Sequence, residues 1–242
     1  MGDHSSSAWF GPSALTFFRQ LKKNNARSWF ETNRSVYESE VRGPLRALVE
    51  EMDVRFARFA PEIVGDPKRA IFRIHRDIRF SKDKSPYKTH AACWFHHGGA
   101  GRTVGREGEG GSAGFYFQLA PNDSFLGGGI WMPPRGSLAA IRDAIVEHPK
   151  SFLKIADDPA LKRRFGGLDA EARLKRMPRG YDENHPAAER LKYQSFTMGR
   201  ALSDAQVTGA RLIRILEEDF QRLLPLVRWL NRALGLNPSA RR

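Results

Sequence analysis

The sequence predicts an α+β fold in which an antiparallel or mixed β-sheet is packed by N-terminal and C-terminal helices. Apolar residues recur at helical spacing between residues 13 and 59 and between 203 and 234, whereas β-branched and aromatic residues are concentrated between 70 and 132. The chain has no internal repeat and no linker between two separate apolar regions. We therefore expect a single domain over residues 13–236.

The N-terminal part of this domain is predicted to be helical. Ser13 can cap a first helix that ends at Asn24-Asn25, and residues 1–12 before it are expected to be flexible. A second helical pattern runs from Trp29 to Val41, stops at Gly43-Pro44 and resumes as far as Phe59.

The sheet is predicted from runs of β-branched and aromatic residues. A first strand begins at Ala70 and continues to Phe80, with arginines interleaved. The glycine-rich segment 98–112 is predicted to be a mobile loop. Three further candidate strands are His90–His96, Gly114–Ala120 and Phe125–Met132, the last two separated by the turn Pro121–Ser124. This order favours antiparallel pairing.

Helices and short strands follow the sheet. Ser137 is predicted to cap a helix that ends near Pro149, and Asp158-Pro159 to start another that ends at Gly166-Gly167. Residues 173–177 and 193–202 are candidate short strands, on either side of a short helix that begins at Pro186.

The C-terminal part of the chain is predicted to be strongly helical. Ser203 and Gln206 have the spacing of a capping box at the start of a long apolar pattern. Pro225 is expected to kink or end this helix, and a final stretch, residues 226–234, precedes a polar tail at 237–242.

Composition restricts the classes of protein to which the chain can belong. Hydrophobic residues make up 40% and charged residues 28%, which excludes a disordered chain and a membrane protein. The start of the chain lacks the layout of a signal peptide, and the single cysteine, Cys93, excludes an internal disulfide and a multi-cysteine zinc site. A cytoplasmic location fits these features. The net charge of +13 predicts attraction for polyanions.

The densest group of charged residues lies between residues 73 and 88. It comprises Arg73, His75, Arg76, Asp77, Arg79, Lys82, Asp83, Lys84 and Lys88. Guanidinium groups stay ionised and match carboxylates and phosphates with a planar fork of donors, which favours a clamp for an anion. The same arginines could instead pair with Asp77 and Asp83 in an internal network that only holds the segment in place. Both interpretations stay open.

Residues 72–88 read F-R-I-H-R-D-I-R-F-S-K-D-K-S-P-Y-K. This run resembles the signature R-x-x-R-D-x-R-F-x-x-D-K-x-P-Y-K of a widespread bacterial family of conserved hypothetical proteins, also seen in fungi, known as domain-of-unknown-function family 2461. The resemblance extends to Asn24-Asn25, Arg27, Trp29-Phe30, Asn33, Tyr37, Gly127-Gly128-Gly129, Trp131, Pro133, Pro178, Gly180-Tyr181 and His185-Pro186. It implies a bacterial, cytoplasmic, single-domain protein and no particular chemistry.

These residues lead to the hypothesis of a pocket for a small anionic or phosphorylated ligand. We expect the pocket to join the charged segment to the glycine-rich fourth strand. Its candidate ligand-binding residues are Arg73, Arg76, Arg79, Lys84, Tyr87, Lys88, Gly128 and Trp131. If the site also catalyses a reaction, Asp77 or Asp83 would be the general base. No cofactor is indicated, and no metal site is expected because no carboxylate accompanies the histidines at ligand spacing.

Two other classes of function stay open. Non-specific nucleic-acid binding would use the basic surface, although the sequence has no helix-turn-helix, zinc finger or ribonucleoprotein motif. A structural or partner-binding protein would use the charged segment as an internal salt-bridge network. No membrane partner is expected, and the oligomeric state stays open.

Overall fold

Five strands form one antiparallel sheet in the order β1-β2-β3-β4-β5. In this computed structural model, residues 8–79, 82–100 and 111–238 are described. The strands are β1 Ile63–Val64, β2 Ala91–His97, β3 Gly114–Leu119, β4 Ser124–Ile130 and β5 Phe196–Leu202. Sequential neighbours pair throughout, so the predicted α+β class and antiparallel pairing are confirmed.

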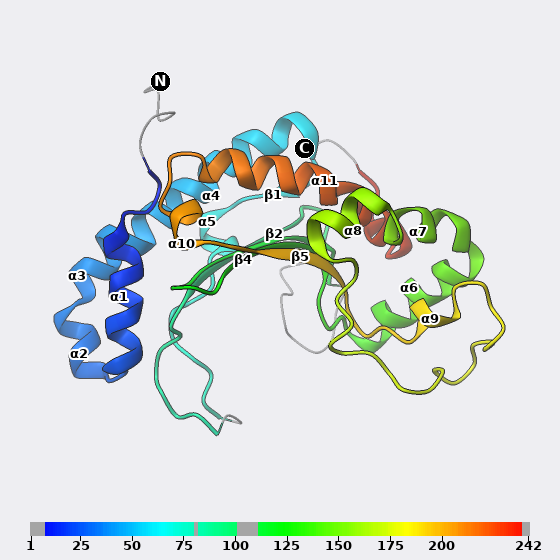
Figure 1. The fold of residues 1–242 in the computed structure, drawn as a ribbon, viewed down its shortest axis with the longest axis horizontal. Helices are drawn as coiled ribbons and strands as arrows, with labels where there is room; N and C mark the ends of the chain where they lie inside the picture. Colours follow the sequence, from blue (N-terminus) through cyan, green and yellow to red (C-terminus); the bar gives the residue numbers. More distant parts are fainter. Residues whose placement is uncertain (1–7, 80–81, 101–110, 239–242) are drawn as a thin grey trace.

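Helices at both ends of the chain cover the sheet. The N-terminal ones are α1 Pro12–Lys23, α2 Arg27–Thr32, α3 Arg34–Val36, the π-helical segment η2 Tyr37–Arg42, α4 Gly43–Phe59 and α5 Pro67–Ala70. The others are α6 Arg135–Glu147, α7 Pro149–Ala156, α8 Pro159–Phe165, α9 Ala188–Leu191, α10 Asp204–Val207 and α11 Leu212–Ala233. Figure 1 shows α4 and α11 together above the sheet, with α1–α3 at one end and α6–α9 at the other.

Aromatic rings join α4 and α11 to one face of the sheet. The Phe220 ring of α11 stacks on Phe115 of β3 with centroids 4.7 Å apart, and Phe56 of α4 stacks on Phe115 at 5.6 Å. All three residues are fully buried. Because buried aromatic side chains contribute a large part of the hydrophobic stabilisation of a core, this cluster holds both helices on the sheet.

The predicted stop at Gly43-Pro44 is wrong, because the helical path continues from η2 into α4. The Gly43 N–H donates to the carbonyl of Glu38 in the wider π pattern. A proline inside an α-helix lacks its own N–H and clashes with the carbonyl four residues earlier. The π-helical turn relieves this conflict at Pro44 by widening the path before it.

The predicted first strand, Ala70–Phe80, is also wrong. Over its described residues the segment makes only isolated bridges, Ile71 to Cys93 and His75 to Tyr87, and β1 takes the edge position beside β2. The interleaved arginines stay in contact with solvent as a loop, since a paired strand would bring their charges against the sheet. Residues 173–177 likewise form a single bridge, from Arg173 to Tyr193, and β5 begins only at Phe196.

The start and end signals of the C-terminal helices are partly confirmed. Asp158 caps α8, Gly166 ends it with a φ of +79°, and Ser203 forms the predicted capping box with Gln206. Ser137 is wrong as a cap because α6 begins at Arg135. Pro225 does not end α11, because tertiary packing on both sides of the proline outweighs its local penalty.

Three segments predicted from the sequence lie largely outside the described residues. These are the N-terminus, predicted to be flexible (residues 1–7 not described), the glycine-rich segment, predicted to be a mobile loop (101–110), and the polar tail (239–242).

A buried carboxylate joins α11 to β5 and α8. Asp219 has no exposed surface and accepts hydrogen bonds from Arg164 Nε at 2.8 Å and from Arg200 Nη2 at 2.6 Å. Two guanidinium groups therefore compensate the one buried negative charge, which makes the removal of the carboxylate costly.

The Asp219→Ala variant should lower the free energy of unfolding by about 2 kcal/mol or more, because it leaves two partly buried arginines without their carboxylate. Urea unfolding followed by circular dichroism measures this change. The adjacent Glu218→Ala variant is the control, since the Glu218–Arg214 pair is exposed and should contribute less than about 1 kcal/mol. Equal losses in the two variants would contradict the assignment.

Candidate functional site

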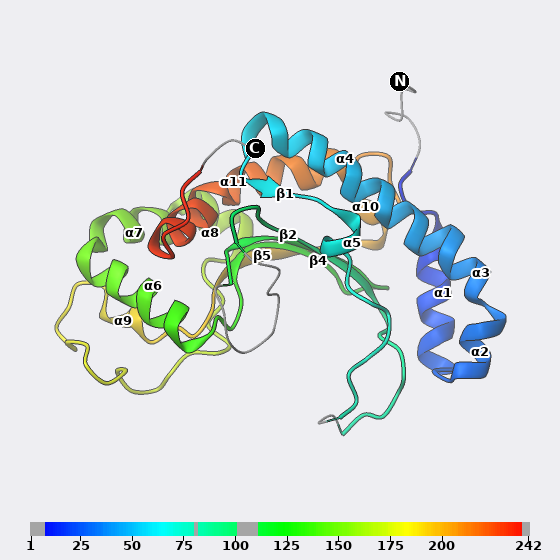
Figure 2. The ribbon, with the colours of Figure 1, turned by 180° about the vertical axis from the view of Figure 1, so that it is seen from behind.

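The charged segment forms a long loop between α5 and β2. The chain leaves the sheet after Phe72, which lies beside the start of β2, and returns to enter β2 at Ala91. We call residues 72–88 the motif loop. It lies beside α1–α3 on the side of the sheet away from α4 and α11 (Figure 2). Near the sheet the Phe72 N–H donates to Ala92 O at 3.0 Å, and the Lys88 N–H to Ile74 O at 2.8 Å. The loop is thus held at its base by backbone hydrogen bonds.

Within the outer part of the motif loop, charged residues pair with one another. Arg79 Nη2 donates to Asp77 Oδ2 at 2.7 Å, and Arg76 is bonded to Asp83. Lys84 Nζ donates to the carbonyl of Ile78 at 2.9 Å. This part of the motif therefore corresponds to the internal network that the sequence also allowed.

The two candidate general bases are tied up in these contacts. Side-chain and backbone hydrogen bonds from Arg79 lower the pKa of Asp77 to about 2. Hydrogen bonds from Ser85, and then from Arg76, lower the pKa of Asp83. A carboxylate with a lowered pKa is a poor proton acceptor near neutral pH, so the geometry gives neither residue the properties of a general base.

Tyr87 connects the motif loop to the N-terminal helices. Its ring is buried and stacks on Phe30 with centroids 4.2 Å apart. Asn25 accepts from the Tyr87 N–H at 3.1 Å and donates to its carbonyl at 2.9 Å. Tyr87 is one of the candidate ligand-binding residues, and these contacts make it an anchor of the loop. No local sequence pattern predicts the hydrogen bonds between Asn25 and Tyr87, because the two residues are far apart in the sequence.

At the base of the motif loop, Lys88 lies within the electrostatic influence of Arg73 and Arg76, and we call these three residues the basic cluster. Burial, followed by the positive charges of Arg73 and Arg76, lowers the pKa of Lys88. Lys88 is only partly exposed, and its Nζ lies 5.3 Å from the centre of the Phe72 ring. Within the described residues, neither Lys88 nor Arg73 forms an ion pair with a carboxylate.

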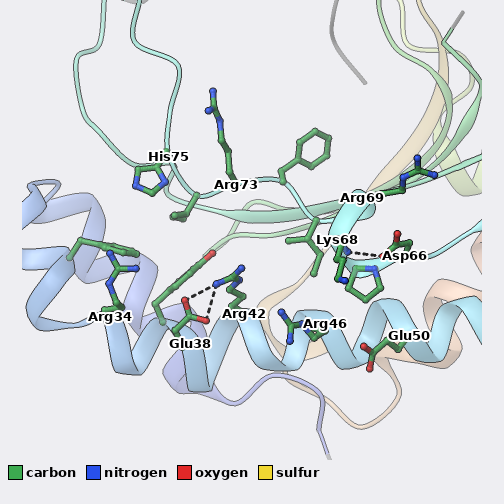
Figure 3. A pocket seen from close by; sticks show the side chains of 16 residues that line it. Arg34, Glu38, Arg42, Arg46, Glu50, Asp66, Lys68, Arg69, Arg73 and His75 are labelled. Atoms are coloured by element: carbon green, nitrogen blue, oxygen red, sulfur yellow. Dashed lines mark hydrogen bonds and ion pairs between the residues drawn. The ribbon is translucent and has the colours of Figure 1, made fainter. Parts of the chain in front are cut away.

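An open cleft of about 820 Å³ lies between the motif loop and the N-terminal helices. Figure 3 shows Arg34, Arg42 and Arg46 on the helical side and Lys68, Arg69, Arg73 and His75 on the other. Arg42 is paired with Glu38, and Arg34 with Glu31. The Arg73 guanidinium points away from α4, so it belongs with the basic cluster more than with the floor of the cleft (Figure 3).

Gly128 and Trp131 do not lie beside the motif loop. The motif loop enters the sheet at Ala91, whereas Trp131 follows the opposite end of β4 and is 70% exposed. Gly128 faces α11 instead: a Cβ there would lie 3.1 Å from Leu223 Cβ. The glycine lets the helix approach the strand closely, a packing role.

Outside the motif loop, the reactive side chains of the described residues include the thiol of Cys93. Cys93 is fully buried, and burial raises the pKa of its thiol. In the parts of the chain that the structure describes, no group of three or more metal-ligating side chains is gathered. None of the helices in those parts is long and apolar enough to span a membrane.

Comparison with known proteins gives one match. A family model described as Conserved hypothetical protein (DUF2461) matches residues 13–229, which include the motif loop, the cleft and all five strands. No curated protein and no solved structure matches the chain.

The Arg79→Ala variant should raise the pKa of Asp77 from about 2 towards the ordinary value of an aspartate, because it removes the side-chain hydrogen bonds and leaves the backbone one. Titration of the aspartate carboxyl signals by NMR measures the shift. Asp83 provides an internal control, since its pKa is lowered chiefly by Ser85 and should move little. An unchanged pKa for Asp77 would show that the pair does not persist in solution.

Proposed function

The chain belongs to this family of conserved hypothetical proteins, and we propose that it binds a small phosphate-bearing ligand at the basic cluster. The observation that carries the proposal is the half-buried ammonium group of Lys88, which lies beside Arg73 and Arg76 with no carboxylate paired to it in the described chain. A phosphate group would supply a negative charge to Lys88 and Arg73, neither of which is paired with a carboxylate in the described residues.

The half-buried position of Lys88 has an energetic cost. Removing a cation from water is unfavourable unless an opposite charge or a hydrogen bond compensates it, and neighbouring cations increase the cost. The Phe72 ring offers Lys88 a partial compensation through the cation–π contact. An anion between Lys88 and Arg73 would relieve the repulsion and gain charge-assisted hydrogen bonds. The free protein therefore holds these groups in an arrangement suited to an anion.

The purely structural interpretation accounts for only part of the motif. It explains Arg79 and Asp77, and it explains the contact of Arg76 with Asp83. It offers no reason for placing Lys88 and Arg73 together, because an internal network would be more stable with a carboxylate between them. Binding, without a catalytic step, is the function that this geometry supports.

Inorganic pyrophosphate is the probe for this proposal, with binding measured by isothermal titration calorimetry at low ionic strength. Lys88→Met keeps an aliphatic side chain over Phe72 and removes the charge, and it should weaken binding about tenfold or more. Arg73→Gln should have a comparable effect. Wild-type affinity in both variants would overturn the proposal.

Two control variants separate the basic cluster from its surroundings. Arg46→Ala removes a cleft arginine on α4 that has no ion pair in the described chain, and Arg222→Ala removes an exposed arginine on α11. Both remove one positive charge, so both should bind pyrophosphate nearly as the wild type does. A loss in Arg46→Ala without a loss in Lys88→Met would place the ligand in the cleft instead.

A further inference from the structure

A row of three aromatic rings begins at the basic cluster and crosses the sheet. We call Phe72, Tyr116 and Phe125 the aromatic row. The ring centroids of Phe72 and Tyr116 are 6.2 Å apart, and those of Tyr116 and Phe125 are 6.4 Å apart. Lys88 Nζ lies 5.3 Å from the first ring. Cations and aromatic rings are therefore parts of one continuous surface.

The aromatic row lies on the face of the sheet opposite α11. Phe115 packs on Phe220 of α11, and successive side chains of a strand point to opposite faces, so Tyr116 points away from that helix. Phe125 pairs with Gln118, two residues along β3 from Tyr116, so Phe125 lies on the same face as Tyr116 and diagonally across from it. The row thus lies on the same side of the sheet as the motif loop (Figures 1 and 2).

Glycines let the last ring of the row lie flat on the backbone. A Cβ at Gly199 would overlap the Phe125 ring, and one at Gly127 would lie 3.0 Å from its Cε1 atom. The backbone of β4 and β5 therefore supports one side of the ring. Phe125 is nevertheless 37% exposed, so an apolar surface supported from beneath is open to solvent. A ring placed in this way offers a stacking surface to a planar partner.

Nucleic-acid bases joined by phosphates match a surface that combines aromatic rings with cations. Stacking on aromatic side chains together with cations that follow the backbone is the usual way in which proteins bind single-stranded nucleic acid. A duplex cannot use the rings, because its bases are stacked on one another. The row is longer than one ring, and the chain carries a net charge of +13, so a strand fits better than a free nucleotide.

We infer that single-stranded nucleic acid is the ligand of this surface, with a phosphate at the basic cluster and bases on the aromatic row. This inference rests on the proposed function, because the basic cluster supplies the phosphate contact. It adds the class of ligand and the residues that recognise its bases.

The test uses a fluorescein-labelled single-stranded oligonucleotide of about ten nucleotides, with binding followed by fluorescence anisotropy. Phe125→Leu should weaken binding about fivefold or more, since stacking contributes about 1–3 kcal/mol per base. Phe72→Leu, at the other end of the row, should weaken it similarly, and it provides a second readout if Phe125→Leu folds poorly. A duplex of the same sequence should bind more weakly than the single strand.

One variant serves as the control. Trp131→Leu removes an exposed aromatic side chain at the opposite end of β4 and should leave binding unchanged.

The outcomes separate this inference from the proposed function. Equal affinity for single strand and duplex, or wild-type affinity in both Phe125→Leu and Phe72→Leu, would overturn the inference and show that only charge attracts the oligonucleotide. Pyrophosphate binding that depends on Lys88, without oligonucleotide binding, would leave the proposed function standing. If neither pyrophosphate nor the oligonucleotide binds, both the proposed function and this inference are wrong.

Discussion

The close packing of α11 on β4 is the contact on which the rest of the structure depends. Gly128 has no side chain to keep Leu223 away from the strand, so the helix can approach and place Phe220 on Phe115. Phe56 of α4 joins the same cluster, and Asp219 of α11 binds arginines from two other elements. The helix α11 therefore contacts the sheet, the N-terminal helix α4 and the helix α8. Removing any of these contacts would expose apolar rings or leave charges unpaired.

This packing uses only one face of the sheet and leaves the other available for the motif loop and the aromatic row. The loop begins and ends at the edge of β2, where backbone hydrogen bonds hold its base and Tyr87 joins it to α2 through Phe30. A loop anchored in this way can carry charged residues on a rigid support. The packing that stabilises the core and the proposed binding surface thus lie on opposite faces of the sheet.

The charges of the motif separate into two groups with different partners. In the outer loop, Asp77 and Asp83 bind Arg79 and Arg76, and these pairs maintain its conformation. At the base, Lys88 and Arg73 have no carboxylate paired to them in the described chain. Local pairing reduces the electrostatic cost of the outer loop, and the uncompensated charge is concentrated beside the aromatic row. The same short run of residues can therefore serve both structure and binding.

The sequence by itself determined the α+β class, the positions of β2, β3 and β4, the capped start of α8 and the concentration of charge in residues 73–88, because these features depend on local periodicity, turn residues and charge. Tertiary structure decided that Ala70–Phe80 pairs too little to be a strand, and that Tyr87 is an anchor. It also placed Trp131 at the opposite end of the sheet and brought Lys88, Phe72 and Phe125 onto one surface. These outcomes depend on contacts between residues far apart in the chain, and local patterns carry no information on which distant elements will become neighbours.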